Sequence, residues 1–226
     1  MDELSEMPRR QVKAVLFDFD GTLTRPGALD FSRIRRAIGC PSGTTVLEYI
    51  AGIREPLQKR RASLLLERFE AQGAAASKPG PGAEAVISFL RRRGIRVGIL
   101  TRNTRKTVDR ALENFRYTRV SDFDVIITRD DPVRPKPEPD GILLAARRMG
   151  VETREILVVG DYVFDIQAGI RAGAVTVFLD NGGGENGRTG SSFSITGLEE
   201  LKRIVFSSQI GKVIAQKRGV GSLGFP

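Results

Sequence analysis

Short apolar runs recur along the chain from residue 12 onward, and most are followed by a polar turn and a stretch with apolar residues at helical spacing. The apolar runs predict strands at Val12–Phe17, Arg96–Leu100, Val125–Thr128, Ile156–Val159 and Val175–Leu179. The amphipathic stretches predict helices at Glu84–Arg93, Thr104–Asn114, Pro139–Met149, Ile166–Arg171 and Gly197–Phe206. Strands that alternate with helices are typical of crossover connections, so we expect an α/β fold with a parallel sheet covered by helices on both faces.

A long segment with a helical pattern separates the first two predicted strands. It adds about 55 residues, too many for an ordinary loop. Phe31, Ile34 and Ile38, and later Leu65 and Phe69, recur at helical spacing. The pattern therefore predicts a small α-helical cap inserted into the α/β core.

The insertion divides the chain into a core of residues 1–23 and 80–210 and a cap of residues 24–79. Both flanks of the cap, Thr24–Gly27 and Lys78–Gly82, hold the Pro and Gly residues of linkers, so the cap could move as a lid. The last residues, 211–226, show no clear period and are predicted to be disordered.

Composition limits the class of protein. Of the 226 residues, 40% are hydrophobic, which is enough for a sizeable core. No apolar run approaches the roughly 20 residues of a membrane-spanning helix, and the start Met1–Glu6 is acidic, unlike a signal peptide. We therefore expect a cytoplasmic protein with no membrane partner. Nothing in the sequence indicates the oligomeric state.

The chain contains no histidine and a single cysteine, Cys40. This excludes Ser-His-Asp and Cys-His catalytic sites, His-ligated zinc sites and disulfides within the chain. Cys40 is interpreted as a small packing residue rather than a reactive thiol. Any catalysis must therefore use Asp, Glu, Lys, Ser, Thr or Tyr side chains, a metal ion or an added cofactor.

The formal net charge of +9 is concentrated in the insertion and the C-terminal segment. Residues 25–79 hold 10 Lys or Arg and 5 Asp or Glu, whereas residues 207–226 hold 3 and none. Such a surface can bind a small anion or nucleic acid, or can simply be solvated. For the tail we favour a solvated surface. For the insertion both an anionic substrate and a solvated surface stay open, and Arg33, Arg36 and Arg54 are the candidates to bind such a substrate.

One glycine-rich segment, residues 182–187, formally matches a dinucleotide-binding fingerprint. That fingerprint needs a helix N-terminus beneath the pyrophosphate, and Arg188–Ser194 is polar and loop-like. A flexible loop is the favoured interpretation.

Candidate catalytic and binding residues follow the predicted strands. Asp18 and Asp20 come directly after the first strand, where a Gly-containing loop lets two carboxylates converge, and converging charges need a cation, a shared proton or a substrate. Three more motifs follow other strands: Thr101, Lys136 in Arg134-Pro135-Lys136-Pro137, and Gly160-Asp161 with Asp165. Because the carboxyl ends of neighbouring parallel strands meet at one edge of a sheet, we expect one site.

Each motif also has a purely structural interpretation. The first could be a surface Asp-Gly turn, and Lys136 could lie in a solvated Pro-rich loop. Thr101 and Asn103 could cap the following helix, while Asp161 and Asp165 could be an N-cap and a first-turn acid. The occurrence of all four motifs together favours the functional interpretation.

The four motifs, in order, resemble those of the haloacid dehalogenase superfamily. They are Asp18-Phe19-Asp20-Gly21-Thr22-Leu23, Leu100-Thr101, Lys136-Pro137-Glu138-Pro139 and Gly160-Asp161 with Asp165. The resemblance spans Val12 to about Leu179, implies a Rossmann-like core and includes the small cap of the phosphoglycolate phosphatase group.

The resemblance implies catalytic roles for three residues. Asp18 would be the nucleophile that forms an aspartyl-phosphate. Asp20 would protonate the leaving alkoxide and then deprotonate the attacking water. Lys136 would supply a fixed positive charge that offsets the repulsion between a carboxylate and a phosphate.

The resemblance also implies binding roles. Mg²⁺ would be held by Asp18, Asp161 and the backbone carbonyl of Asp20, with Asp165 as a ligand directly or through water. The non-transferred phosphoryl oxygens would be bound by a second set: Thr101, the backbone amides near Gly21 and Arg102, and Asn103 as a helper.

The sequence thus predicts a Mg²⁺-dependent phosphatase that acts on a small anionic phosphorylated metabolite. Dehalogenases lack the second acid because halide leaves without a proton, so Asp20 favours phosphoryl transfer to water or to a sugar. A sugar phosphomutase resembling β-phosphoglucomutase is the alternative enzyme. A non-catalytic nucleic-acid-binding protein is the alternative from another class, although the aromatic content is only 7% and no nucleic-acid module is recognisable.

Overall fold

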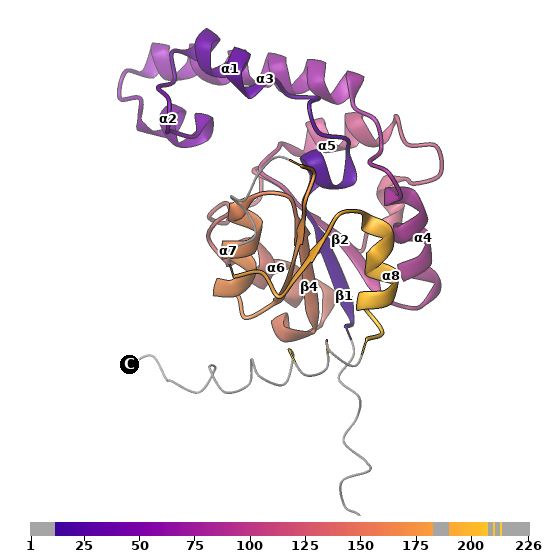
Figure 1. Ribbon diagram of the computed structural model, residues 1–226. Helices are drawn as coiled ribbons and strands as arrows, with labels where there is room; N and C mark the ends of the chain where they lie inside the picture. Colours follow the sequence, from indigo (N-terminus) through magenta and orange to yellow (C-terminus); the bar gives the residue numbers. More distant parts are fainter. Residues whose placement is uncertain (1–11, 183–189, 208–209, 211–212, 214–226) are drawn as a thin grey trace, which may run out of the picture.

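A six-stranded parallel sheet forms the centre of the computed structural model, which describes residues 12–182, 190–207, 210 and 213 (Figure 1). The strands lie in the order β3-β2-β1-β4-β5-β6. Their bounds are β1 Ala14–Phe17, β2 Arg96–Leu100, β3 Val125–Ile127, β4 Ile156–Gly160, β5 Val175–Leu179 and β6 Phe193–Ile195. Every neighbouring pair is parallel, so the predicted α/β fold is confirmed. Residues 1–11, 183–189 and 214–226 lie outside the described residues, and with them the acidic start, most of the glycine-rich segment and nearly all of the predicted tail.

The edge strand β6 was missed by the sequence pattern, which predicted a loop through Ser194. Phe193–Ile195 instead pairs in parallel with β5, through the register Val177 to Phe193 and Leu179 to Ile195. Three residues, of which only Ile195 is buried, are too few to show either a strand period or a sustained apolar run.

The two faces of the sheet bury different sets of side chains because successive residues of a strand point to opposite sides. In β1, Val15 and Phe17 belong to one apolar cluster, whereas Ala14 and Leu16 belong to the other. Both faces are therefore apolar, and the strand reads as a continuous hydrophobic run rather than an alternating one.

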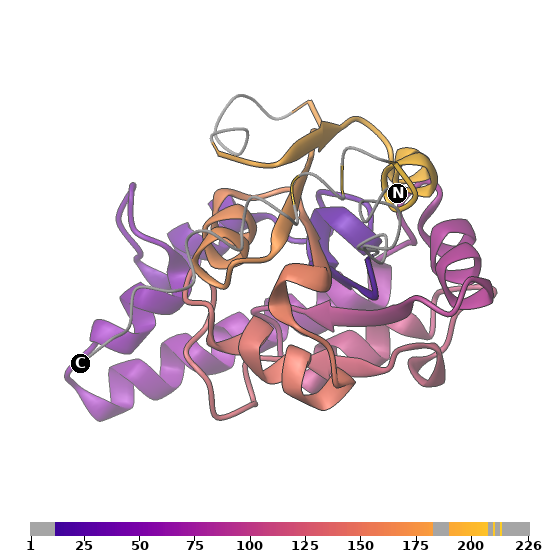
Figure 2. The same ribbon diagram turned by 90° about the horizontal axis from the view of Figure 1, so that it is seen from below.

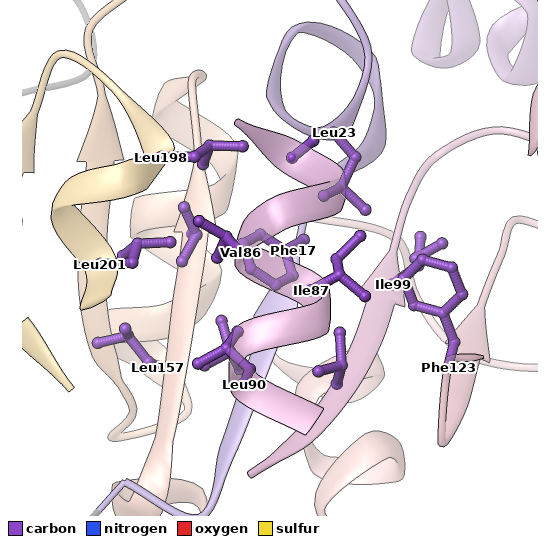
Figure 3. Close-up of a cluster of buried hydrophobic side chains, with 14 of the residues drawn as sticks. Phe17, Leu23, Val86, Ile87, Leu90, Ile99, Phe123, Leu157, Leu198 and Leu201 are labelled. Atoms are coloured by element: carbon purple, nitrogen blue, oxygen red, sulfur yellow. The ribbon is translucent and has the colours of Figure 1, made fainter. Parts of the chain in front are cut away.

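Helices from the described residues cover both faces. The Phe17 side is covered by α4 Ala83–Arg92, α5 Arg105–Leu112 and α8 Leu201–Ile204. Figure 3 shows Val86, Ile87 and Leu90 of α4 packed over Phe17 and Leu157. The opposite side is covered by α6 Asp140–Met149 and α7 Val163–Arg171. The predicted helix at 197–206 is divided into a short 3₁₀ turn, Leu198–Glu200, and α8.

The insertion, residues 24–79, contains α1 Phe31–Ile38, α2 Val46–Gly52 and α3 Pro56–Ala76. It lies across the end of the sheet where the strands terminate and extends beyond one side of the core (Figures 1 and 2). Its helices bury an apolar cluster of their own that includes Ile34, Ile50 and Leu66. The division of the chain into core and cap domains stays a prediction.

The two segments that connect the insertion to the core run side by side. Thr24 and Pro79 form an antiparallel bridge, and Gly80 N–H donates to the Leu23 carbonyl at 2.7 Å. The predicted linkers are thus paired with each other at the base of the insertion. Within the described residues, no helix combines the length and the apolar character that crossing a membrane requires.

Candidate active site

The carboxyl edge of the sheet, where the parallel strands end, carries all four sequence motifs. Asp18 follows β1 at the centre, Thr101 follows β2 on one side, and Asp161 follows β4 on the other. Lys136 lies in the loop beyond β3. The Asp18 N–H donates to the Val159 carbonyl at 2.8 Å, so pairing with β4 continues to the predicted nucleophile.

Lys136 connects two of the motifs. Its Nζ lies 2.5 Å from Asp18 Oδ1 and 2.5 Å from Asp165 Oδ1, and only 5% of its side chain is exposed. Burial alone would lower the pKa of Lys136, but attraction from Asp165 and Asp18 outweighs it and raises the pKa above its usual value. Lys136 is therefore a permanently charged ammonium between two carboxylates, not a solvated loop residue.

Three carboxylates form a compact cluster beside this ammonium. One oxygen from each of Asp18, Asp161 and Asp165 lies within 4.8 Å of the others. Burial raises the pKa of Asp18 well above its ordinary value; Lys136 opposes this, and the charges of Asp165 and Asp161 add to it. Burial and the charge of Asp165 raise the pKa of Asp161 to about 6. The three carboxylates thus carry more negative charge than the ammonium of Lys136 can neutralise.

A divalent cation fits this cluster. Carboxylate oxygens are the hard ligands that Mg²⁺ prefers, and a cation would relieve the repulsion that the raised pKa values record. Asp161 also has support that keeps it in place, since Thr22 Oγ1 donates to it at 3.3 Å and Asn181 Nδ2 at 3.2 Å. Asp165 is less available, because Oδ1 accepts from Lys136 and Oδ2 accepts from Tyr162 N–H at 3.1 Å.

Two glycines leave room for these carboxylates. Gly21 has φ +78°, and a Cβ there would lie 2.2 Å from Asp161 Oδ2. A Cβ at Gly160 would lie 2.3 Å from Cβ, Cγ and Oδ2 of Asp165. Any larger residue at either position would displace the acid that the motif supplies, which explains why the chain has glycine there.

Asp20 is separate from the carboxylate cluster. Its Oδ2 accepts from Asn103 Nδ2 at 2.5 Å, and both residues are close to the pocket described below. Burial raises the pKa of Asp20, although the hydrogen bond from Asn103 opposes the shift. Asp20 therefore points toward the β2 side of the site, so of its groups only the backbone carbonyl remains a predicted metal ligand.

The loop after β2 lines the pocket described below through Thr101, Arg102 and Asn103, and their role in phosphate binding stays a prediction. Thr101 is buried, and its Oγ1 accepts from Asn103 N–H at 3.1 Å. Neither residue caps α5, because Thr104 is the N-cap and accepts from Thr107 N–H at 3.2 Å. The predicted alternative of helix capping is wrong for Thr101 and Asn103. The N-cap of α7 is likewise Tyr162 rather than Asp161, although Asp165 does act as the first-turn acid.

A pocket of about 300 Å³ lies between the carboxyl edge and the insertion. Its floor includes Asp18, Asp20, Thr101, Lys136 and Asp161. The insertion contributes a mainly apolar wall with two charged residues, Arg35 and Glu70; the apolar members are Leu29, Phe31, Val46, Leu47 and Leu66.

The arginines expected to face the substrate do not line this pocket. Arg33, Arg36 and Arg54 are exposed, and the Arg33 guanidinium lies over the Phe69 ring, 5.5 Å from its centroid. Arg35 of the same helix lines the pocket instead. The rotation of α1 decides this outcome, because buried Ile34 fixes which neighbours point toward the core.

The family of the chain follows from comparison with known proteins. The model of the haloacid dehalogenase-like hydrolases matches residues 12–173, which span all four motifs and the insertion. The chain belongs to this family. The resemblance seen in the motifs is therefore confirmed, and the protein is a haloacid dehalogenase-like hydrolase.

Relatives of this hydrolase are named as hydrolases or phosphatases. An uncharacterized hydrolase of Saccharomyces cerevisiae is 34% identical over 76% of this chain and 79% of its own length. The N-acetylmuramic acid 6-phosphate phosphatase of Pseudomonas aeruginosa is 27% identical over 78% of this chain and 85% of its own. A solved hydrolase from Pseudomonas syringae shares the fold, with a TM-score of 0.70 at 24% identity over 85% of this chain and 97% of that one.

Two ion pairs between the insertion and the core of the hydrolase were missed by sequence reasoning. Glu70 of α3 is buried and accepts from Arg129 through two hydrogen bonds of 2.8 Å. Glu48 of α2 pairs with Arg102, whose guanidinium also lies over the Phe164 ring, 5.2 Å from its centroid. The Arg102 side chain thus contacts the insertion, and only its backbone amide stays a predicted phosphate ligand.

Asn181 was also missed. Its Nδ2 donates to the Gly21 carbonyl at 2.7 Å and so connects the end of β5 to the first motif. A usable signal was present, because Asn181 follows the predicted strand Val175–Leu179 as the other motifs follow theirs.

Proposed function

We propose that this hydrolase is a Mg²⁺-dependent phosphatase that cleaves a small phosphomonoester through an aspartyl-phosphate on Asp18. The observation that carries the proposal is the convergence of Asp18, Lys136 and Asp161 at the floor of a pocket that also exposes Asp20. The phosphatase named among the relatives supports the same substrate class.

Asp18 is the proposed nucleophile. Lys136 holds one of its oxygens at 2.5 Å, which fixes the carboxylate and offsets repulsion from an incoming phosphate dianion. A bond forms between an Asp18 oxygen and phosphorus while the bond from phosphorus to the substrate oxygen breaks. Mg²⁺, held by Asp18, Asp161 and the Asp20 carbonyl, would supply Lewis-acid stabilisation of the phosphoryl oxygens.

Asp20 is the proposed acid and base. As a partly buried carboxyl with a raised pKa, it holds a proton more readily than a fully exposed one, and it gives that proton to the departing alkoxide. The resulting carboxylate then takes a proton from water, which attacks the phosphorus of the intermediate. Inorganic phosphate leaves, and Asp18 regains its free carboxylate. Asn103 keeps the Asp20 side chain in place through both steps.

The insertion is the proposed lid. Its apolar wall faces the charged floor, so closure removes water from the reacting groups and strengthens their electrostatic interactions. The Glu70–Arg129 and Glu48–Arg102 pairs hold it against the loops that follow β3 and β2.

The two alternatives are less well supported. The relatives reported above have hydrolase and phosphatase names, which does not favour a phosphomutase. A non-catalytic nucleic-acid-binding protein would have no need for a buried ammonium among three carboxylates. Residues 214–226 of the basic tail lie outside the described residues.

The decisive experiment is phosphate release from a panel of phosphorylated metabolites, with EDTA and with added Mg²⁺. We expect hydrolysis with Mg²⁺ and none with EDTA. Equal rates in both conditions would contradict the proposed site.

Mg²⁺ binding is expected to weaken as the pH falls through about 6, because the metal binds the deprotonated carboxylates while the pKa of Asp161 is about 6 and that of Asp18 is also raised. Above this range the apparent affinity should level off. Titration calorimetry between pH 5 and 8, together with the Mg²⁺-dependent rise in Tm, measures the effect without turnover. Asp161→Asn should abolish most of the binding. An affinity independent of pH would count against these ligands.

Asp20→Asn should lower kcat by an amount that depends on the leaving group of the substrate. Alkyl phosphates need a proton on the leaving oxygen, so their kcat should fall by about 10²–10⁴-fold. Aryl phosphates with acidic leaving groups should lose much less in their first step. A pre-steady-state burst with p-nitrophenyl phosphate isolates that step. Equal losses for both classes would remove Asp20 from the acid role.

A further inference from the structure

In the part of the chain that the structure describes, the insertion's wall of the pocket holds an arginine without an ion-pair partner. Arg35 of α1 is half-buried, and its Nε is buried without a hydrogen-bond partner. No described carboxylate forms an ion pair with its guanidinium. A guanidinium has five donors and is costly to bury unpaired, so its position among apolar side chains indicates a missing anionic partner.

The acidic residues of the same pocket cannot fill that role. Glu70 uses Oε1 and Oε2 for Arg129, at 2.8 Å each. Glu48, outside the pocket lining, pairs with Arg102. The carboxylates of the floor are engaged by Lys136 and Asn103 or belong to the proposed metal site. The positive charge of Arg35 therefore remains available to a molecule that enters the pocket.

The pocket thus combines charged groups of the core with a mainly apolar wall from the insertion. The proposed phosphoryl-transfer site belongs to the core, whereas Arg35 belongs to α1 of the insertion. Leu29, Val46, Leu47 and Leu66 line the wall on the insertion side. A pocket of about 300 Å³ is at the small end of the range for metabolite sites, so the substrate that spans it is compact.

We propose that Arg35 determines substrate specificity by binding a second anionic group, a carboxylate or a phosphate, at the end of the substrate remote from the reacting phosphate. The inference rests on the proposed function and adds the substrate class: a small phosphomonoester with a second anion beyond a short apolar spacer. Arg35 binds the planar anion through paired N–H donors, as guanidinium groups do. Because Arg35 belongs to the insertion, the second anion also favours the closed position of the lid.

The test uses n-alkyl phosphates of two to five carbons that end in a carboxylate, a phosphate or a methyl group. Wild-type enzyme should prefer one length with an anionic end over its methyl-ended counterpart by about 10–100-fold in kcat/KM. Arg35→Gln should remove that preference by lowering kcat/KM for the anionic substrates to about that for the methyl-ended one. Arg35→Lys should restore part of it, less for the carboxylate because a lysine cannot form the bidentate pair. The two anionic ends distinguish the carboxylate from the phosphate.

Arg36→Gln is the matched control, since Arg36 is the next residue of α1 and is exposed away from the pocket. It should retain the full preference. The inference is overturned if wild-type enzyme treats anionic and methyl-ended substrates alike, or if Arg35→Gln keeps the preference.

Binding of the corresponding phosphonates, which cannot be hydrolysed at the carbon–phosphorus bond, separates this inference from the proposed function. A carboxylate-ended phosphonate should bind wild type at least about tenfold more tightly than its methyl-ended counterpart, and Arg35→Gln should abolish the difference. This result would support Arg35 even if no alkyl phosphate were hydrolysed, whereas hydrolysis without any binding preference would leave the phosphatase proposal standing and overturn the role of Arg35.

Discussion

Asp18→Asn is expected to lower kcat by at least about 10⁴-fold while the protein stays folded. An amide is not a nucleophile toward phosphorus and is not an anionic metal ligand, so both proposed roles of Asp18 are lost. The fold should tolerate the change because an amide oxygen still accepts a hydrogen bond from Lys136. The substitution also removes one of three crowded acids, so the free energy of unfolding without metal should be unchanged or higher.

Two measurements complete this prediction. Rapid quench with a radiolabelled phosphomonoester should trap a phosphoprotein in wild type and none in Asp18→Asn. Asp109→Asn is the matched control, because that aspartate lies on the surface of α5 in an exposed ion pair with Arg105. The control should keep wild-type kcat. Turnover by Asp18→Asn within tenfold of wild type would refute the nucleophile assignment.

The sequence predicted the core of this fold because the central strands are buried on both faces. A central parallel strand needs a nearly continuous apolar run, and β1, β2, β4 and β5 supply one, interrupted only by the exposed Arg96 at the start of β2 and by Thr176 in β5. The parallel topology then brings the motifs together, because the carboxyl ends of neighbouring parallel strands lie at the same edge of the sheet. Asp18, Thr101 and Asp161 are therefore brought close by backbone geometry, which a local sequence pattern can reveal.

The contacts of the insertion could not be predicted in the same way. Arg33, Arg35 and Arg36 have the same chemistry, and only the rotation of α1 against α2 and α3 decides which one reaches the pocket. The Glu70–Arg129 pair joins residues 59 positions apart that follow no shared pattern. Both features depend on how the insertion packs against the rest of the chain, and that placement leaves no period or motif in the sequence.

Lys136→Met should impair both chemistry and stability, because it leaves the stem of the side chain in place but removes the charge between Asp18 and Asp165. Loss of one fixed stabilising charge at the reacting group should lower kcat by about 10²–10³-fold with Mg²⁺ present. In the metal-free protein, two buried carboxylates lose their partner, so the free energy of unfolding should fall by about 2–4 kcal/mol at pH 8.

The pH dependence of that loss identifies its cause. Without Lys136 the raised pKa of Asp18 should rise further, and a carboxyl with a higher pKa in the folded state stabilises the fold when it is protonated and loses this stabilisation as the pH rises. The deficit in the free energy of unfolding relative to wild type should therefore be small near pH 5 and largest near pH 8, and Mg²⁺ should reduce it by neutralising the same acids.

Lys13→Met is the matched control. It removes an ammonium from a 2.8 Å pair with Glu155, but the Lys13 side chain is 60% exposed, so the loss in the free energy of unfolding should stay below about 1 kcal/mol at every pH. Denaturant unfolding of both variants at pH 5, 6.5 and 8 makes the comparison, and equal deficits for Lys136→Met at all three values would show that lost packing, rather than unpaired charge, is responsible.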